Sequence, residues 1–272
     1  MTTPLAPPIA CSRMYNLSPR ISEQWDRLFH WLSLRADIDL EIIPHAAPAP
    51  LSELWARPDM GIVFMCGYPF SRLAPEERPV PLAAPVSLAD WAKGEPVYAS
   101  HIVARRSASF DLADLPALRW GWTVRDSQSG YNAPREFFAE IANGRPVRET
   151  IGPLLNPRGV IEAIGANVID VGAIDAYAYQ LLELHEPDML ASLRVIATTR
   201  PAPFPLLVAA RQLPLEIIDV LQAALLEAQQ SPDGRAILKS LGLAGFARPD
   251  MAAYDQLPAR AKTIDDALAG RW

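Results

Sequence analysis

The sequence predicts an α/β protein in which mostly parallel sheets are flanked by helices. Strand-like and helix-like stretches alternate along most of the 272 residues, and this alternation is typical of strands that feed helices across a parallel sheet. Hydrophobic residues make up 50% of the chain and charged residues 21%, which is ordinary for a globular protein. A chain of this length can therefore bury a substantial core without disulfides.

The strand predictions rest on short apolar runs, many of them rich in β-branched residues. They cover Asp39–Ile43, Gly61–Met65, Val97–Ala104, Arg119–Val124, Val171–Ile174, Arg194–Thr198 and Pro205–Ala209.

The helix predictions rest on apolar residues at helical spacing. Trp25, Leu28 and Leu32 share one face of a helix that Ser22 could cap. The predicted helices cover Ser22–Leu34, Leu51–Ala56, Gly130–Ile141, Gly159–Ala166, Ala176–Leu184, Leu215–Gln229, Asp233–Leu241 and Pro258–Leu268.

Two strand candidates divide this fold into two lobes. The runs at 97–104 and 194–199 are followed by polar or proline-rich segments instead of an immediate helix. If the chain crosses between lobes at these places, residues 103–197 form a continuous inner lobe. Residues 1–102 and 198–272 then form a discontinuous outer lobe.

The charge of the chain argues against a nucleic-acid partner. The formal net charge is −6 and the pI is near 5.3, whereas proteins that bind a phosphate backbone usually carry a basic stripe. No segment approaches the roughly 18 to 20 apolar residues that cross a bilayer, so we expect no membrane insertion. The N-terminus lacks the features of a secretory signal. As written, the sequence predicts a cytoplasmic protein, or a periplasmic one if the natural start lies upstream.

The two cysteines and four histidines do not predict a metal site. Cys11 and Cys66 lie far apart in apolar runs, which favours buried thiols over a disulfide. The histidines show no metal-ligand spacing. We therefore expect neither a metal nor a cofactor.

The segment VRDSQSGYNAPR, residues 124–135, is the most informative candidate site. It follows a predicted strand and opens a helix that Asp126, Ser127 or Ser129 could cap. The hydroxyls, the Gln128 amide and the N–H groups at a helix start also suit an anion. The segment is therefore either a capped turn or an anion-binding site.

Two further segments place a polar side chain at the carboxyl end of a predicted strand, where open α/β sheets bind ligands. Tyr68 follows the strand in FMCGYPF, on a turn that Pro69 restrains. Asp175 ends the strand in VGAIDAYAY and starts a helix. The tyrosine either packs over the sheet or contacts a ligand, and the aspartate either caps the helix or contacts a ligand.

No motif for catalysis is present in the sequence. It lacks the G-x-S-x-G elbow, the H-E-x-x-H zinc motif, the Walker loop and the G-x-G-x-x-G fingerprint. We therefore predict no catalytic residue.

In chain order, these segments resemble the substrate-binding protein family that serves phosphate, phosphite and phosphonate importers. The similar stretches are Met14-Tyr15, Cys66–Pro69, Ser127–Tyr131, Ala173–Asp175 and Leu193–Pro203. They span about residues 9 to 209, and the stretch DSQSGYN is typical of one branch of the family.

The resemblance implies a type 2 periplasmic-binding-protein fold, in which two lobes joined by two crossing strands close on a ligand in the cleft between them. The residues carried over by position are Ser127, Gln128 and Ser129 for the anionic head group, with Tyr131 from the same motif, Tyr15 and Tyr68 from the outer lobe, and Asp175 for a polar group of the ligand or for cleft closure. An exported member would hand its ligand to an ABC permease. We expect a monomer or a weak dimer.

The chain departs from the family before the strand that ends at Asp175. Relatives carry a Gly-Ser-His-x-x-Ser-like turn there, whose histidine and serine complete the anion site. In this sequence Pro157 stands at the histidine position and Val160 at the serine position. Asn156 or Arg158 could supply substitute donors, so we include both among the predicted site residues.

The leading prediction is a binding protein, not an enzyme, for a small anionic, phosphonate-like ligand. A cytoplasmic enzyme of the same fold that acts on a small carboxylate, similar to menaquinone-pathway dehydratases, is the second interpretation, and the missing signal peptide favours it. A scaffold that has lost its ligand is the third, and Pro157 and Val160 favour it.

Overall fold

The computed structural model describes residues 6–272. The chain separates into two compact units: the first runs up to Val97 and includes Pro203–Asp250, and the second comprises Tyr98–Ala202 and Met251–Trp272. Residues 1–5 belong to the N-terminal segment that was expected not to be a secretory signal, and they lie outside the described residues.

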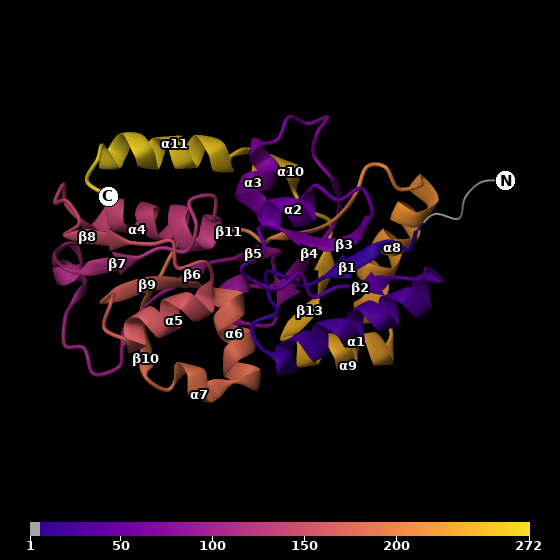
Figure 1. Ribbon diagram of the computed structural model, residues 1–272, viewed down its shortest axis with the longest axis horizontal. Helices are drawn as coiled ribbons and strands as arrows, with labels where there is room; N and C mark the ends of the chain where they lie inside the picture. Colours follow the sequence, from indigo (N-terminus) through magenta and orange to yellow (C-terminus); the bar gives the residue numbers. More distant parts are fainter. Residues whose placement is uncertain (1–5) are drawn as a thin grey trace. The chain divides into compact units, whose positions relative to one another are not determined.

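The first unit is built on a six-stranded sheet with strand order β13-β4-β12-β3-β1-β2. Figure 1 shows α2 and α3 on the opposite side of these strands from α1 and α9. The elements of this unit are β1 (Ile9–Cys11), α1 (Pro19–Ala36), β2 (Glu41–Ile42), α2 (Leu51–Trp55), β3 (Met60–Met65), α3 (Gly67–Arg72), β4 (Val80–Ser87), the 3-10 turn η1 (Asp90–Ala92), β12 (Leu206–Ala209), α8 (Leu215–Glu227), the 3-10 turn η4 (Ala228–Gln230), α9 (Pro232–Ser240) and β13 (Leu243–Ala247).

The second unit is built on a five-stranded sheet with strand order β10-β6-β9-β7-β8. In Figure 1, α4 and α11 lie on one side of this sheet and α5 and α6 on the other. The elements of this unit are β6 (Ser100–Arg105), the 3-10 segment η2 (Leu112–Ala117), β7 (Arg119–Gly121), the π-turn η3 (Gln128–Asn132), α4 (Ala133–Ile141), β8 (Glu149–Ile151), α5 (Pro157–Gly165), β9 (Val171–Asp175), α6 (Ala176–His185), α7 (Pro187–Leu190), β10 (Leu193–Thr198), α10 (Met251–Asp255) and α11 (Leu257–Leu268).

The chain passes between the units in a short two-stranded sheet formed by β5 (Val97–Tyr98) and β11 (Ala202–Pro203), and again after Asp250. The continuous part of the second unit resembles the predicted inner lobe, 103–197. The difference lies at the C-terminus, because Met251–Trp272 belongs to the second unit, whereas the sequence analysis placed it in the outer lobe.

The C-terminal segment joins the second unit because its apolar side chains complete that unit's core. Ile264 and Leu268 of α11 are buried in a cluster with Trp120 and Phe138. The Trp272 ring meets the Trp120 ring edge-on, with centroids 5.2 Å apart. Helical spacing identified α11, but it could not show which of two cores the helix covers.

Both sheets are mixed, which corrects the expectation of mostly parallel sheets. β12 runs antiparallel to β3 and β4, β13 to β4, and β6 to β9 and β10, while the other pairings are parallel. A parallel neighbour needs a long crossover, usually a helix. β6 and β12 each follow a crossing strand without such a helix.

Helix α1 shows how local sequence sets an element. Ser18, not Ser22, caps the helix, accepting a hydrogen bond from the Ile21 N–H at 3.3 Å. Pro19 takes the first helical position, where its missing N–H costs nothing and its fixed φ suits the helix. The buried face then packs aromatically: the Trp25 and Phe64 rings meet edge-on with centroids 5.0 Å apart.

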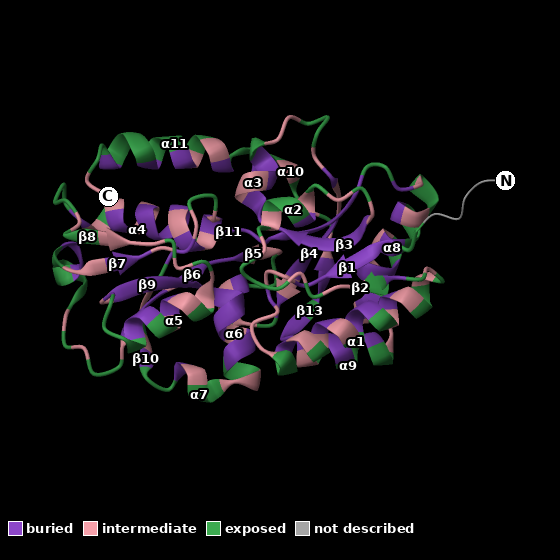
Figure 2. Cartoon of the chain, viewed as in Figure 1, coloured by how far each residue is buried: buried purple, intermediate pink, exposed green. Residues whose placement is uncertain are grey.

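The central strands of both sheets are buried, whereas the edge strands β2, β8 and β10 are partly exposed. The helices expose their outer faces (Figure 2). Cys11 and Cys66 are buried thiols and form no disulfide with each other, as expected. Burial raises the pKa of the Cys11 thiol to about 11. None of the helices in residues 6–272 combines the length and apolar character that a membrane crossing requires.

Candidate functional site

Three helical segments of the second unit begin at the same edge of its sheet. β7 is parallel to both β8 and β9, so the carboxyl ends of these strands share one edge. Each strand leads into a helical segment: β7 into η3 and α4, β8 into α5, and β9 into α6. The N–H groups at each start carry partial positive charge. Together they form the candidate site, at the place where open α/β sheets bind ligands.

The turn after β7 begins its helix with a π-turn. The Ser127 hydroxyl accepts a hydrogen bond from the Gly130 N–H at 2.9 Å, and the Ser127 carbonyl accepts one from the Asn132 N–H at 3.1 Å. Single π-turns within helices are frequent at functional sites. Ser127 is therefore the cap among the three candidates.

Close packing holds this turn against the strands. A Cβ atom on Gly130 would lie 1.9 Å from the Thr123 hydroxyl, so the turn requires glycine there. The buried Ser100 hydroxyl of β6 donates to the Ser129 carbonyl at 2.9 Å. Within residues 6–272, the Ser129 hydroxyl and the Gln128 side-chain amide make no hydrogen bond, and Gln128 is buried.

A narrow recess lies beside this turn. It is lined by Ser100, Gln128, Ser129 and Thr199 together with neighbouring residues of β5, α4 and β11. The side chains leave no room for a water-sized sphere. The recess is therefore filled by its own side chains in this structure.

The helix start after β8 contains both predicted substitute donors. Asn156 caps α5, its side-chain oxygen accepting from the Gly159 N–H at 3.0 Å, which leaves its NH₂ group for other partners. Arg158 points along the helix instead, and its Nε lies 2.9 Å from a Glu162 oxygen in an exposed ion pair. The charge of Arg158 is thus already paired with a carboxylate on the surface of α5.

The two departures from the family's turn are built into the α5 packing. Pro157 occupies the first helical position of α5. Val160 is fully buried, and a Cβ on Gly172 of β9 would lie 2.5 Å from its methyl group. Val160 is therefore a core residue against β9, and it supplies no polar group.

Asp175 caps α6, as the first of its two interpretations predicted. One of its oxygens accepts from the Tyr177 N–H at 2.9 Å and from the Ala178 N–H at 3.1 Å. It is opposite Ser100 on the neighbouring strand β6. Because Ser100 also binds the Ser129 carbonyl, the helix starts after β7 and β9 are close neighbours.

The two predicted tyrosines belong to the first unit and have different environments. Tyr15 is buried, with its ring 4.9 Å from the Phe64 ring and 6.3 Å from the Trp25 ring between centroids. Tyr68 is half-buried on α3, a short helix where the sequence predicted a turn. The Arg72 guanidinium lies 5.7 Å from the centre of its ring.

The structure adds Trp122 and Arg125, which were not predicted as site residues, beside the predicted Tyr131. The Trp122 and Tyr131 rings meet edge-on with centroids 5.6 Å apart. The Arg125 guanidinium lies 5.1 Å from the Trp122 ring and 5.7 Å from the Tyr131 ring, and it donates to the Tyr131 hydroxyl at 3.0 Å. Trp122 and Arg125 lie five and two positions before the cap Ser127, and Tyr131 lies four after it. This spacing carries no recognisable signal, and only the folded turn brings the three side chains together.

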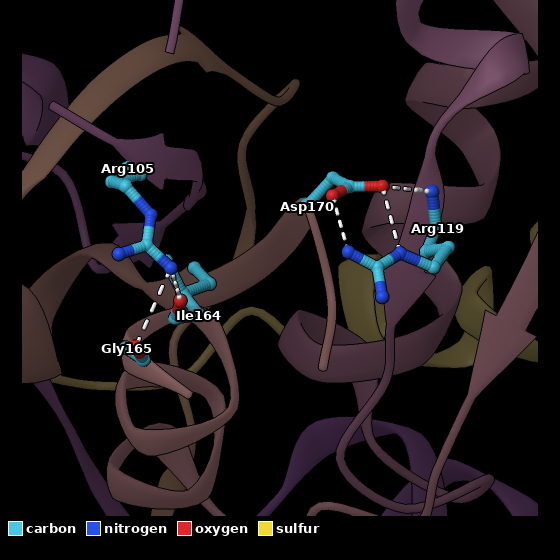
Figure 3. A network of polar contacts seen from close by, with 5 residues as sticks. All are labelled: Arg105, Arg119, Ile164, Gly165 and Asp170. Carbon is cyan, nitrogen blue, oxygen red and sulfur yellow. Dashed lines mark hydrogen bonds and ion pairs between the residues drawn. The ribbon is translucent and has the colours of Figure 1, made fainter. Parts of the chain in front are cut away.

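The opposite edge of the sheet is held by paired polar groups (Figure 3). Asp170, just before β9, accepts hydrogen bonds from the backbone N–H, Nε and Nη2 of Arg119 at 2.9, 3.1 and 2.7 Å. These bonds hold the pKa of Asp170 below its ordinary value of 3.8. The Arg105 guanidinium donates to the Ile164 carbonyl at 2.6 Å, at the C-terminal end of α5.

Within residues 6–272, no three His, Cys, Asp or Glu side chains are arranged to hold a metal ion. The candidate site contains N–H groups, hydroxyls, amides and an arginine, which are donors that suit an anion.

The sequence matches a known protein family. Residues 15–254 match the family described as "ABC transporter, phosphonate, periplasmic substrate-binding protein", which confirms the resemblance seen in the sequence. No curated protein matches the sequence significantly.

Solved structures share the fold at low sequence identity. PhnD1 from Prochlorococcus marinus, in complex with methylphosphonate, has a TM-score of 0.75 at 15% identity over 95% of this chain and 98% of that one. A binding protein component of an ABC phosphonate transporter from Pseudomonas aeruginosa has a TM-score of 0.71 at 18% identity over 98% and 97%. A Xanthomonas citri protein bound to chloride has a TM-score of 0.67 at 19% identity over 95% and 98%.

Proposed function

The chain belongs to the family of phosphonate substrate-binding proteins of ABC transporters, and on this premise we propose that it binds a small phosphonate-like oxyanion at the candidate site. The observation that carries the proposal is the gathering of three helix starts at the carboxyl edge of β7, β8 and β9. Helix N-termini stabilise an anion through their N–H groups and dipoles.

Side chains at this edge add donors of the right kind. The Ser129 hydroxyl and the Gln128 amide have no other partner among the described residues, and the Asn156 NH₂ group is a further donor at the start of α5. Hydrogen bonds to a charged group contribute about 1.5–3 kcal/mol each. Of the two tyrosines in the first unit, Tyr68 is half-buried and has the more accessible ring, because aromatic rings enclose Tyr15.

The family is one of transport proteins and not of enzymes, so the enzyme interpretation loses its support. Its members bind a small ligand for an ABC permease, and the family is described as one of periplasmic proteins. We propose that this chain works there as a monomer and delivers its ligand to such a permease.

Calorimetric titration of the purified protein with methylphosphonate, phosphate, phosphite, sulfate and small dicarboxylates tests the proposal. Methylphosphonate or another phosphorus oxyanion should bind, and a ligand at about 100 times its Kd should stabilise the fold by roughly 2.7 kcal/mol. Binding of dicarboxylates alone would overturn the ligand class. No binding across the panel would favour the scaffold interpretation.

A pair of cap variants separates binding from stability. Ser127 in the second unit and Ser231 in the first cap their helices alike, each accepting from a glycine N–H at 2.9 Å. Ser127→Ala and Ser231→Ala should each lower the free energy of unfolding by about 0.5–2 kcal/mol. Only Ser127→Ala should also weaken ligand binding. Equal affinities in the two variants would contradict the proposed site.

A further inference from the structure

We propose that Arg125 is a ligand-contacting residue of this site, placed by Trp122 and Tyr131 so that its guanidinium binds the anionic group of the ligand. The inference rests on the proposed function and sharpens it, because it adds a positive charge without a carboxylate partner to the site. Arg200, which also lines the recess beside the turn, is paired with Glu140 at 3.0 Å. It also assigns to Arg125 the role that the sequence analysis gave to Arg158.

The guanidinium of Arg125 is held in place by contacts that leave most of its N–H donors without a partner. It lies over two aromatic rings, at 5.1 Å from Trp122 and 5.7 Å from Tyr131, and one N–H donates to the Tyr131 hydroxyl. An arginine carries five N–H donors in a rigid planar fork. The remaining donors face no carboxylate, since Arg125 makes no ion pair with any residue from 6 to 272, its neighbour Asp126 included. Arg125 is exposed, so a ligand can reach it.

The aromatic support is itself anchored to two of the three helix starts. The Trp122 ring lies against the loop before α5, where a Cβ on Gly152 would come within 2.5 Å of it. The Leu154 N–H of the same loop donates to the Trp122 carbonyl at 3.0 Å. Tyr131 belongs to η3, at the start of α4. The cluster therefore joins the turn after β7 to the loop after β8, between which an anion would lie.

An unpaired cation at this place is electrostatically unfavourable unless an anion binds. Helix N-termini carry a partial positive charge and disfavour cations, yet Arg125 comes just two residues before the cap Ser127. A bound oxyanion would stabilise both charges at once. Arginine also binds oxyanions with two parallel N–H···O bonds, which lysine cannot do.

Two other arginines of this region show what a structural role looks like. Arg135 also approaches the Tyr131 ring, at 4.7 Å, but it is buried and paired with Asp265 of α11 at 2.5 Å. Arg158 is paired with Glu162. Because both have carboxylate partners within the chain, neither has the unpaired charge that distinguishes Arg125.

The test measures the Kd for methylphosphonate and for phosphate by calorimetry in the wild type, Arg125→Gln, Arg125→Lys and the control Arg158→Gln. Arg125→Gln should raise the Kd about 10- to 100-fold, the range expected when a charge-assisted contact is lost. Arg125→Lys should fall between, because it keeps the charge but loses the fork. Arg158→Gln should change the Kd less than about threefold. Raising the salt from 50 to 200 mM should weaken the wild type more than Arg125→Gln.

The outcomes separate this inference from the proposed function. If the wild type binds neither methylphosphonate nor phosphate, the proposed function fails and the inference fails with it. If the wild type binds and Arg125→Gln binds within twofold of it, the proposed function stands and the inference is overturned. Circular dichroism and unchanged melting temperatures identify folded variants. If Arg125→Gln proves unfolded, the comparison of Arg125→Lys with the wild type decides by the same criterion.

Discussion

The two edges of the five-stranded sheet in the second unit use polar groups in opposite ways. At the amino edge of β7 and β9, Asp170 accepts three hydrogen bonds from Arg119, and Arg105 donates to the last carbonyls of α5. At the carboxyl edge, Ser129, Gln128 and Arg125 keep donors that no described residue uses. One edge satisfies its polar groups internally and the other leaves donors for a ligand.

The difference follows from the direction of the strands. Parallel strands bring helix N-termini to their carboxyl edge and helix C-termini to their amino edge. A C-terminus is stabilised by a fixed cation of the chain, as Arg105 provides for α5. A helix N-terminus is stabilised by an anion. Near the start of η3 and α4, this chain has the cation Arg125, which has no carboxylate partner among the described residues. Changes at the carboxyl edge should therefore alter binding, and changes at the amino edge should alter stability alone.

The largest effect should come from Gly159→Ala at the carboxyl edge. The new Cβ would lie 2.0 Å from the Leu154 carbonyl oxygen, and a backbone atom cannot move aside as a side chain can. We expect a loss of about 1–3 kcal/mol in the free energy of unfolding. Binding should weaken as well, because the Gly159 N–H is the donor that Asn156 caps. Urea unfolding and calorimetric titration measure the two effects.

Gly165→Ala at the other end of α5 is the matched control. A Cβ there meets no atom within 4 Å, and alanine is favoured over glycine in helices by roughly 0.5–1 kcal/mol. This variant should be as stable as the wild type or slightly more stable, with unchanged affinity. Equal destabilisation by both substitutions would show that the close contact at Gly159 is not the cause of the lost stability.

At the amino edge, Asp170→Asn should lower the melting temperature by roughly 2–4 °C, the shift expected for about 1 kcal/mol in a chain of this size. The asparagine amide is uncharged and has a single acceptor oxygen, whereas both oxygens of the Asp170 carboxylate accept from Arg119. The Kd for methylphosphonate should not change. Glu162→Gln, which breaks the exposed pair with Arg158, is the control and should leave the melting temperature nearly unchanged. A tenfold change in the Kd of Asp170→Asn would end the distinction between the two edges.

The contribution of Asp170 should also depend on pH with a defined sign. Its hydrogen bonds with Arg119 lower its pKa in the folded state below the ordinary value of 3.8. The stabilisation is therefore complete well above pH 4 and is lost as the pH falls through the folded-state pKa. The difference in melting temperature between wild type and Asp170→Asn should be constant from pH 6 to 8 and shrink below about pH 4. A difference that grows in acid would contradict this assignment.

Local signals in the sequence were enough for most helices and for the residues that cap them. The predicted helix Ala176–Leu184 is observed as Ala176–His185, and Asp175 caps it as expected. β4 was missed because Pro81 and Pro85 interrupt its apolar run. Prolines lack the N–H that a sheet hydrogen bond requires. The strand nevertheless pairs with both neighbours, with a shift of register in each pairing. Strand direction was misjudged because pairing is set by contacts distant in the sequence.

The sequence could predict only those parts of the candidate site that lie within a single short segment. The turn at 127–131 and the helix start at Asp175 were found because caps and anion sites use the same residue types. Arg125 was not, because its significance depends on the rings of Trp122 and Tyr131 and on the absence of a carboxylate partner in the folded chain. Arg158 was predicted, beside Asn156, as a substitute donor from its position, and only the structure shows it paired with Glu162.

The smallest effect should come from Arg105→Met, which keeps the aliphatic stem and removes the guanidinium from the C-terminal carbonyls of α5. The lost interaction with the helix end is worth about 0.3–1 kcal/mol. Arg106→Met is the neighbouring control, since the Arg106 side chain donates to the Ala191 carbonyl, away from α5. The affinity for methylphosphonate should be the same in both variants, because the Asn156 cap and buried Val160 hold the start of α5 independently of its end. An affinity loss confined to Arg105→Met would show that the two edges are mechanically coupled through α5.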